Sequence, residues 1–261
     1  MPMYKDQLDR SIDIPCPPTR IVSLVPSQTE LLFDLGLDAE VVGITKFCIH
    51  PVHWFRNKTR IGGTKTVKMD LVASLKPDLI LANKEENLQQ QIEELEKIAP
   101  VWVSDIHNQE QAYQMIQNIG EIADKKNEAD TIVQSIRSGF SQIAGMRTKK
   151  YRTAYLIWKD PYMCAGNDTF INDLMKLCGF DNVIPASRYP SVTIESLQQQ
   201  KPELLLLSSE PYPFRQKHIE ELQQELPATK IILVDGEMFS WYGSRMIKAA
   251  GYFAESLKNI E

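Results

Sequence analysis

The 261-residue chain lacks any run of about 18 apolar residues, the length that a membrane-spanning helix requires. Its opening residues, MPMYKDQLDRSIDIP, contain no basic segment followed by an apolar one, so no signal peptide is visible. No lysine- or arginine-rich block occurs and the net charge is -5, so we expect no nucleic acid as a partner. These absences predict a soluble protein that stays where it is made, or the mature form of a protein whose sequence has been given a new starting residue.

Disulfide and catalytic motifs are absent as well. The four cysteines have no CxxC spacing, and a chain of this length can bury a core without disulfides, so we expect reduced, mostly buried thiols. No GxSxG, HExxH, P-loop or GxGxxG motif occurs. The sequence therefore favours a binding protein over an enzyme, with no resident cofactor.

Short apolar runs alternate with helical patterns along the chain, which predicts parallel sheets covered by helices. Before the first helix, Ser27 and Glu30 have the spacing of a capping box, and Gly36 is expected to end that helix. The expected strands are 21–25, 41–44, 79–82, 101–103, 153–158, 204–207 and 231–234. The expected helices are 31–35, 70–75, 87–98, 109–123, 170–177, 194–199, 218–225 and 244–257.

One segment breaks this alternation near the middle of the chain. Apolar residues recur at helical spacing over 128–146, and no strand separates this segment from the helix before it. An ordinary packing helix would explain the pattern, but its position favours a connector between two lobes. We therefore expect an α/β fold with an N-terminal lobe at 1–126, a connecting helix at 127–147 and a C-terminal lobe at 148–261.

The two halves also share a sequence repeat. Residues 70–81, DLVASLKPDLIL, align without a gap to residues 195–206, ESLQQQKPELLL, at an offset of 125. Each copy opens a helix with an acidic residue, Asp70 or Glu195. The favourable interaction of a carboxylate with a helix N-terminus explains one such acid, but it does not by itself require an acid at the same position in both copies. The repeat predicts two related lobes.

These residues resemble a known family. The segment with Pro26, Ser27, Thr29 and Glu30, the stretch GITKFCIHP at 43–51 and the duplicated LKPDLIL segment are similar to helical-backbone substrate-binding proteins. Such proteins serve ABC-type uptake of cobalamin, iron-siderophores and haem. The resemblance covers residues 19–257 and implies two Rossmann-like lobes joined by one long helix, with ligand in the cleft between them.

The resemblance also implies a partner and a location. In this family one acidic residue on each lobe pairs with arginines of a membrane permease, and Asp70 and Glu195 fall at those positions. Paired charges of this kind fix orientation as well as attraction. The expected protein is a periplasmic monomer that carries a metal chelate. A cytoplasmic corrinoid- or metal-binding protein is the alternative, because it would explain the missing signal peptide.

Candidate ligand residues follow from the rule that ligands of α/β sheets lie beyond the carboxyl ends of the strands. Aromatic rings would suit a corrin, porphyrin or catecholate. For each ring taken singly, packing in the core is the competing interpretation, and it is weakest for residues 239–242, which lie outside any periodic element. The predicted ligand-binding residues are Phe47, His50, Trp54, Lys65, Trp158, Phe239, Trp241, Tyr242 and Arg245.

Two local features bear on the chemistry of the ligand. Cys48 and His50 could bind a soft metal, and the histidine could occupy an axial position on the metal of a chelate. A turn whose polar side chains cap backbone groups is the simpler explanation. Where the cobalamin binders of this family place a tryptophan, this chain has Gly62-Gly63-Thr64-Lys65. Lys65 would suit an anionic chelate or a corrin phosphate.

Overall fold

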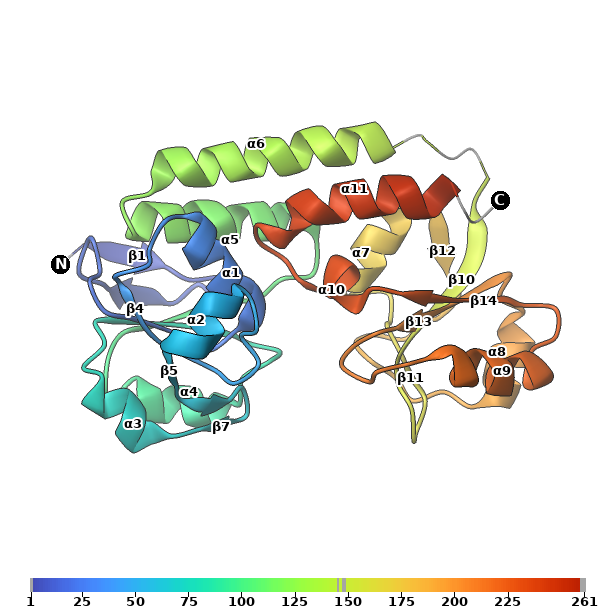
Figure 1. Cartoon of the computed structure of the whole chain (residues 1–261), viewed down its shortest axis with the longest axis horizontal. Helices are drawn as coiled ribbons and strands as arrows, with labels where there is room; N and C mark the ends of the chain where they lie inside the picture. Colours follow the sequence, from blue (N-terminus) through green and yellow to red (C-terminus); the bar gives the residue numbers. More distant parts are fainter. Residues whose placement is uncertain (1, 145, 147–148, 259–261) are drawn as a thin grey trace. The chain divides into compact units, whose positions relative to one another are not determined.

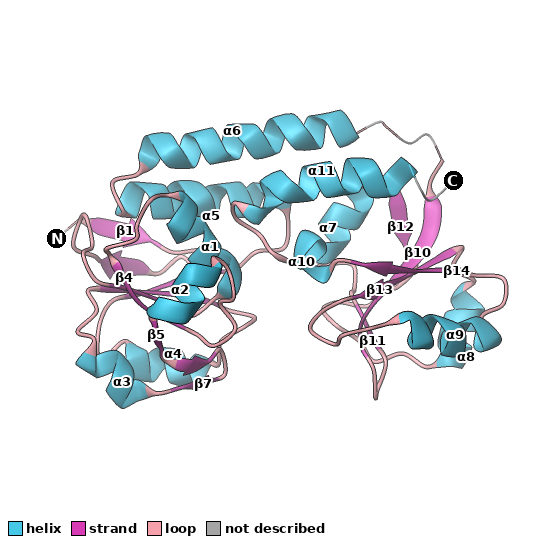
Figure 2. Cartoon of the chain, viewed as in Figure 1, coloured by secondary structure: helices cyan, strands magenta, loops and turns pink. Residues whose placement is uncertain are grey.

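The chain forms two compact α/β units in a computed structural model that describes residues 2–144, 146 and 149–258 (Figures 1 and 2). Unit 1 contains the described residues up to Ile106, together with Glu110–Ser135 and Tyr242–Arg245. Unit 2 contains His107–Gln109, Ile136–Trp241 and the described residues from Met246 onward. Within the described residues, no helix has the length and apolar character that crossing a membrane requires.

A five-stranded parallel sheet forms the centre of unit 1. Its order is β5-β4-β3-β8-β9, and each neighbouring pair is parallel. Every residue of β3, β8 and β9 is buried, which explains why each of these strands is apolar up to its last residue, a serine or an asparagine. The bounds are β3 (Ile21–Ser23), β4 (Val41–Ile44), β5 (Thr59–Arg60), β8 (Leu79–Asn83) and β9 (Val101–Ser104).

Five helices and two short hairpins complete this part of the chain. The helices are α1 (Pro26–Asp34), α2 (Val52–Asn57), α3 (Met69–Ser74), α4 (Gln89–Leu95) and α5 (Gln109–Ile122). The hairpins are β1 (Met3–Lys5) with β2 (Ser11–Asp13), and β6 (Gly62–Gly63) with β7 (Thr66–Val67). The sequence pattern predicted neither hairpin and not α2, because two- and three-residue strands and a six-residue helix are too short to establish a period.

Unit 2 has its own, largely parallel sheet. Its order is β11-β10-β13-β14, with β12 also pairing with β10, and only β11 is antiparallel. The strands are β10 (Tyr151–Trp158), β11 (Met163–Cys164), β12 (Phe180–Asn182), β13 (Leu204–Ser208) and β14 (Lys230–Val234). The helices are α7 (Phe170–Leu177), α8 (Ile194–Gln200), α9 (Gln216–Glu225), α10 (Gly236–Ser240) and α11 (Arg245–Lys258).

Helices cover both faces of the unit 2 sheet. Leu156 of β10 shares an apolar cluster with Leu197 of α8 and Leu222 of α9. The preceding residue, Tyr155, points to the opposite face, since successive side chains of a strand alternate. Its ring centroid lies 5.2 Å from that of Phe239 in α10. Both units therefore have the predicted α/β architecture, which confirms the expected fold class.

The long helix α6 (Lys126–Ile143) runs from unit 1 into unit 2, with the division after Ser135. Within unit 1, a Cβ added at Gly120 of α5 would lie 2.3 Å from the Cβ of Ala129 in α6. Within unit 2, a Cβ at Gly139 of α6 would lie 2.7 Å from that of Ala250 in α11. Glycine thus allows close helix packing in each unit. The predicted helix end at 147 lies outside the described residues.

The sequence repeat corresponds to a structural one. The α3–β8 segment of unit 1 and the α8–β13 segment of unit 2 have the same order of elements. The Lys-Pro turn between helix and strand places Lys76 at φ 46° and Lys201 at φ 49°, both left-handed. Gly36 and Gly179, which follow α1 and α7, also match, at φ 79° and 76°. The prediction that the lobes are related is confirmed.

In each unit one arginine, Arg20 or Arg152, forms hydrogen bonds to the repeated segment. The Arg20 amide donates to the Asp78 carboxylate at 2.8 Å, and the Arg152 amide donates to Glu203 at 3.0 Å. The guanidinium of Arg20 donates to the carbonyl of Leu75, and that of Arg152 to the carbonyl of Gln200, at the end of the preceding helix. The acid after each Lys-Pro turn therefore anchors the helix to the sheet.

Two local predictions at helix ends were wrong. The Ser27–Glu30 capping box does not form, because α1 begins at Pro26 and its N-cap residue, Val25, has no side-chain cap. Proline is favoured at the first helical position, since its fixed φ suits the helix and its missing N–H is not needed there. Residues 239–242 were also expected outside any regular element, whereas Phe239 and Ser240 end α10.

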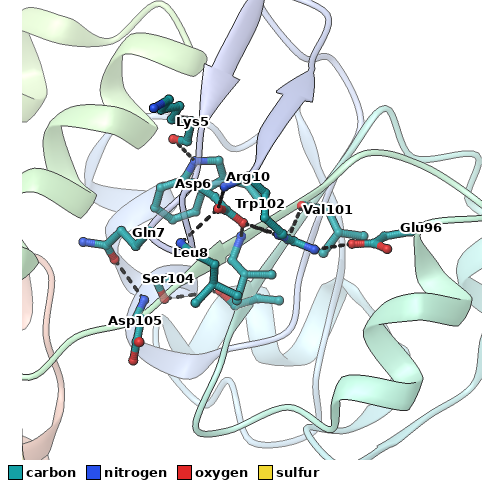
Figure 3. Close-up of polar contacts among 12 residues, drawn as sticks. Lys5, Asp6, Gln7, Leu8, Arg10, Glu96, Val101, Trp102, Ser104 and Asp105 are labelled. Carbon is teal, nitrogen blue, oxygen red and sulfur yellow. Dashed lines mark hydrogen bonds and ion pairs between the residues drawn. The ribbon is translucent and has the colours of Figure 1, made fainter.

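The N-terminal hairpin is fixed to the edge strand β9 by polar contacts (Figure 3). The Asp6 carboxylate accepts from the Arg10 side chain at 2.8 Å, and Arg10 also donates to the carbonyl of Val101. The Gln7 amide donates to the carbonyl of Val103, and the Trp102 indole to the carbonyl of Lys5, each at 3.1 Å. The hairpin thus covers a strand edge that would otherwise be open to pairing.

Candidate functional site

In unit 1 an exposed turn follows β4 at the carboxyl edge of the sheet. Phe47 and Ile49 in this turn are 50% and 41% exposed. The Lys46 ammonium lies 5.0 Å from the centroid of the Phe47 ring, within reach of a cation–π interaction. The turn therefore offers a flat aromatic surface next to a positive charge, at the sheet edge where α/β proteins bind ligands.

The β6–β7 hairpin lies beside this turn. A Cβ added at Gly63 would lie 3.2 Å from Cε2 of Phe47, so the absent side chain leaves room for the ring. Asn87 and Gln91 hold the hairpin by donating to the carbonyls of Thr64 and Lys65, at 2.8 and 3.1 Å. The Lys65 side chain is exposed. Phe47 and Lys65 thus come from adjoining loops of one unit.

The Cys48 thiol is an interior group rather than an exposed one. It is fully buried and within 3.1 Å of both the Thr29 and Thr45 hydroxyls. Burial raises its pKa to about 11, which disfavours the thiolate that a metal would need. Among the described residues, no three or more His, Cys, Asp or Glu side chains are grouped to hold a metal ion. Metal binding by Cys48 and His50 stays a prediction without structural support.

The Trp54 ring lies in the core of unit 1, 1% exposed. Its indole N–H donates to the Asp38 carboxylate, and this bond, with Lys58 nearby, holds the pKa of Asp38 below its ordinary value. Phe33 packs edge-on against both Trp54 and His53, with centroids 5.5 and 5.2 Å away. Trp54 is therefore part of the core in this structure, and ligand contact by Trp54 stays a prediction.

In unit 2 the exposed aromatic surface is at the carboxyl end of β10. Trp158 is 39% exposed, and its ring packs edge-on against Tyr212, 5.7 Å between centroids. Tyr212 follows β13 and its amide donates to the carbonyl of Ile157 at 3.3 Å. Each unit thus presents an exposed aromatic ring at the carboxyl edge of its sheet, Phe47 in unit 1 and Trp158 in unit 2.

The aromatic residues near the end of the sequence are buried. Phe239 is 2% exposed, and Trp241 is 7% exposed with its indole N–H donating to Glu210 at 2.8 Å. Burial raises the pKa of the Glu210 carboxyl, and the hydrogen bonds from Ser240 and Trp241 oppose that rise. Neither ring is accessible in this structure, so ligand contact by Phe239 and Trp241 stays a prediction.

Tyr242 and Arg245 are anchored in unit 1. Arg245 Nε lies 2.7 Å from Oε2 of Glu30 in α1, and both side chains are about 5% exposed. The Tyr242 hydroxyl lies 3.3 Å from Oε1 of Glu86. The buried ion pair between Arg245 and Glu30 joins two residues 215 positions apart. The PSxTE motif contains Glu30, but no sequence spacing indicates that Arg245 is its partner.

Asp70 and Glu195 occupy the same place in the two units. Each is exposed and is the second residue of its helix, Asp70 in α3 and Glu195 in α8. In α8, the Glu195 backbone amide and the Thr193 hydroxyl hold the pKa of the Glu195 carboxyl below its ordinary value. The predicted pair of acids is therefore structurally equivalent, and its role in docking is not tested by this geometry.

A cavity of about 410 Å³ lies in unit 1, and none of the predicted ligand residues lines it. It is formed by β1 and the turn that leads to β2, by Asp105 after β9, and by α5. Its lining is mostly polar and includes Asp9, Gln111, Gln114, Asn118 and Glu121.

Comparison with curated proteins gives relatives that span nearly the whole chain. An uncharacterised ABC transporter substrate-binding lipoprotein, YvrC of Bacillus subtilis, is 27% identical, covering 97% of this chain and 84% of its own length. A vitamin B12-binding protein of Photorhabdus laumondii is 25% identical, covering 93% of this chain and 89% of its own length. These relatives agree with the resemblance found in the motifs.

Solved structures agree on the fold. The petrobactin-binding protein YclQ of Bacillus subtilis superposes with a TM-score of 0.82 at 19% identity, over 98% of each chain. The family model described as "Periplasmic binding protein" matches residues 21–231. That match contains the exposed turn after β4, the β10 edge and both copies of the acidic helix start. The chain belongs to the periplasmic binding protein family.

Proposed function

We propose that this protein is the substrate-binding component of an ABC-type uptake system for a metal chelate, either cobalamin, an iron-siderophore or haem. It binds the chelate through exposed groups at the carboxyl edges of its sheets and delivers it to a membrane permease. The likeness to a substrate-binding lipoprotein supports a location outside the cytoplasmic membrane.

The observation that carries this proposal is the equivalent placement of Asp70 and Glu195. Both carboxylates are exposed at the second position of a repeated helix. The acids that anchor the repeat are instead Asp78 and Glu203. Two exposed charges in equivalent positions suit a partner with two matching cationic sites, because such a pair sets both attraction and orientation.

For the ligand surface, we propose the predicted residues that the structure leaves accessible. Phe47 and Trp158 supply flat apolar area, which suits the large ring systems of these chelates. Lys65 supplies a positive charge for a carboxylate or phosphate of the ligand, and His50 adds a polar group in the same unit. The remaining predicted residues are buried and act through packing.

An absorbance titration with cyanocobalamin, haemin and a ferric catecholate siderophore tests the ligand class. We expect saturable binding of one of the three and a loss of roughly tenfold or more in Phe47→Ala or Trp158→Ala, the effect of truncating a central aromatic contact. Ile247→Ala, an equally exposed apolar residue of α11, is the control and should leave affinity unchanged. No saturable binding of any of the three chelates would contradict the metal-chelate proposal.

Transport of the bound chelate tests the docking pair. The double charge reversal Asp70→Lys with Glu195→Lys should abolish uptake in cells that depend on this protein, while chelate affinity in solution stays the same. Glu220→Lys reverses an exposed acid of α9 and should leave uptake intact. Wild-type uptake by the double variant would contradict a docking role for these acids.

A further inference from the structure

His218 is a buried titratable residue beneath the exposed aromatic surface of unit 2. It is the third residue of α9 and is 3% exposed. Its ring packs edge-on against Tyr212 and Phe214, with both centroids 5.5 Å away. The side chain therefore supports the segment that connects β13 to α9.

Both nitrogens of the His218 ring have partners. Nδ1 accepts the backbone N–H of Arg215 at 2.9 Å, which caps the start of α9. A nitrogen that accepts this bond carries no proton, so the neutral ring holds its proton on Nε2. Nε2 lies 3.4 Å from the Tyr212 hydroxyl, which can accept that proton in a hydrogen bond. The neutral ring thus ties Tyr212 to the start of α9.

Tyr212 in turn supports Trp158. The two rings pack edge-on at 5.7 Å, and the Tyr212 amide is bonded to the carbonyl of Ile157, the neighbour of Trp158. A chain of contacts therefore leads from the start of α9 through His218 and Tyr212 to the exposed Trp158 ring. All residues of this series of contacts belong to unit 2.

The surroundings of His218 favour its neutral form. Burial lowers the pKa of His218 below its ordinary value of 6.5, and nearby cations lower it further. Because the folded-state pKa lies below the unfolded one, the stability that neutral His218 contributes is present above pH 6.5 and is lost as the pH falls through the folded-state pKa. The charged groups that face it are Lys159, Lys217 and Arg215, with Glu221 as the opposing anion.

We propose that His218 positions the Trp158 ring through Tyr212, and that protonation of Nδ1 releases this ring in mild acid. The added proton turns Nδ1 into a donor facing the N–H of Arg215, so the cap is lost and the segment that bears Tyr212 is freed. Because Trp158 belongs to the proposed ligand surface, chelate binding weakens as His218 becomes charged. This last consequence rests on the proposed function.

Fluorine NMR of 5-fluorotryptophan-labelled protein tests the positioning without any ligand. The chain has four tryptophans, and Trp158→Phe assigns the resonance of interest. Between about pH 8 and pH 5, we expect this resonance to titrate with a midpoint below the ordinary histidine value. His218→Gln should abolish the titration and retain the neutral-pH position, because glutamine at the third helical position can accept the same N–H without charging.

His53→Gln is the matched control: His53 packs against the Phe33 ring in unit 1, so this variant should leave the Trp158 titration unchanged. His218→Lys should hold the Trp158 resonance at its acid position at every pH. A Trp158 resonance that does not titrate, or that titrates equally in His218→Gln, would overturn the positioning role. Because these readouts need no chelate, they stand even if the proposed function fails.

Cyanocobalamin affinity measured at the same pH values tests the functional consequence. We expect wild-type affinity to fall about three- to tenfold from pH 8 to pH 5, the range that one aromatic contact is worth. His218→Gln should lose this dependence. A pH-independent affinity despite a titrating Trp158 resonance would overturn the link to binding. No cyanocobalamin binding at any pH would exclude cobalamin as the ligand and leave the positioning result standing.

Discussion

Replacing Arg245 by methionine should severely destabilise unit 1. Arg245 Nε lies 2.7 Å from Glu30 Oε2, and the side chains are 6% and 5% exposed. Methionine keeps most of the aliphatic volume but removes the charge, so the Glu30 carboxylate is left buried without its cation. Removing one partner from such a pair costs about 3–5 kcal/mol of unfolding free energy, because the remaining charge is poorly solvated.

The magnitude can be measured by urea unfolding followed by circular dichroism and tryptophan fluorescence. Coincidence of the two transitions checks that a single free energy of unfolding is defined. For a chain of this size, a loss of about 3–5 kcal/mol corresponds to a fall in Tm on the order of 10 °C. Arg56→Met, which removes an exposed arginine of α2, should change stability by less than about 0.5 kcal/mol.

A double variant separates the pair from the packing around it. Glu30→Leu with Arg245→Met removes both charges, and apolar replacement of a buried pair is often neutral or stabilising. The double variant should therefore be more stable than Arg245→Met alone. A single variant that loses less than about 1 kcal/mol, or a double variant no better than the single, would refute this reasoning. Chelate affinity of a stable double variant would also test the ligand role predicted for Arg245 from the sequence.

Two further predictions concern backbone conformation and thiol reactivity. Gly36→Ala should cost about 1–2 kcal/mol in urea unfolding because φ is 79° there, whereas Gly251→Ala, in helix α11 with equal open space, should gain about 0.5–1 kcal/mol; similar effects at both sites would contradict a conformational cause. Exposed Cys16 should react with a thiol reagent in the native protein at pH 8, whereas Cys48, with its raised pKa and full burial, should react only after unfolding. If native wild type were rapidly labelled at one more thiol than native Cys48→Ser, the burial of Cys48 would be contradicted.

The architecture could be predicted from local patterns because each pattern has a local cause. Strands buried on both faces are predominantly apolar, as in β8 and β13, which are buried throughout. Helix α7 was expected at its observed bounds, since its apolar spacing is strong and Gly179 follows in a left-handed conformation. The repeat was visible because Lys-Pro, an acid and an apolar strand recur at one offset.

The candidate site could be predicted only in part. Phe47 follows a predicted strand, Trp158 is the last residue of another, and both are exposed as a ligand surface requires. Trp54 is also aromatic and comes from the segment after the same strand as Phe47, yet it lies in helix α2, buried against Phe33 and bonded to Asp38. Exposure of an aromatic ring depends on what packs over it, and residue type does not contain that information.

The sequence alone therefore determined the fold class, the two related halves and the equivalent acids Asp70 and Glu195, because periodicity and spacing are local properties of the chain. Tertiary structure alone decided that Arg245 pairs with Glu30 and that His218 supports Trp158 through Tyr212. These contacts join residues from 6 to 215 positions apart across different elements. Their existence depends on which helix faces which strand, and that is settled only when the whole core packs.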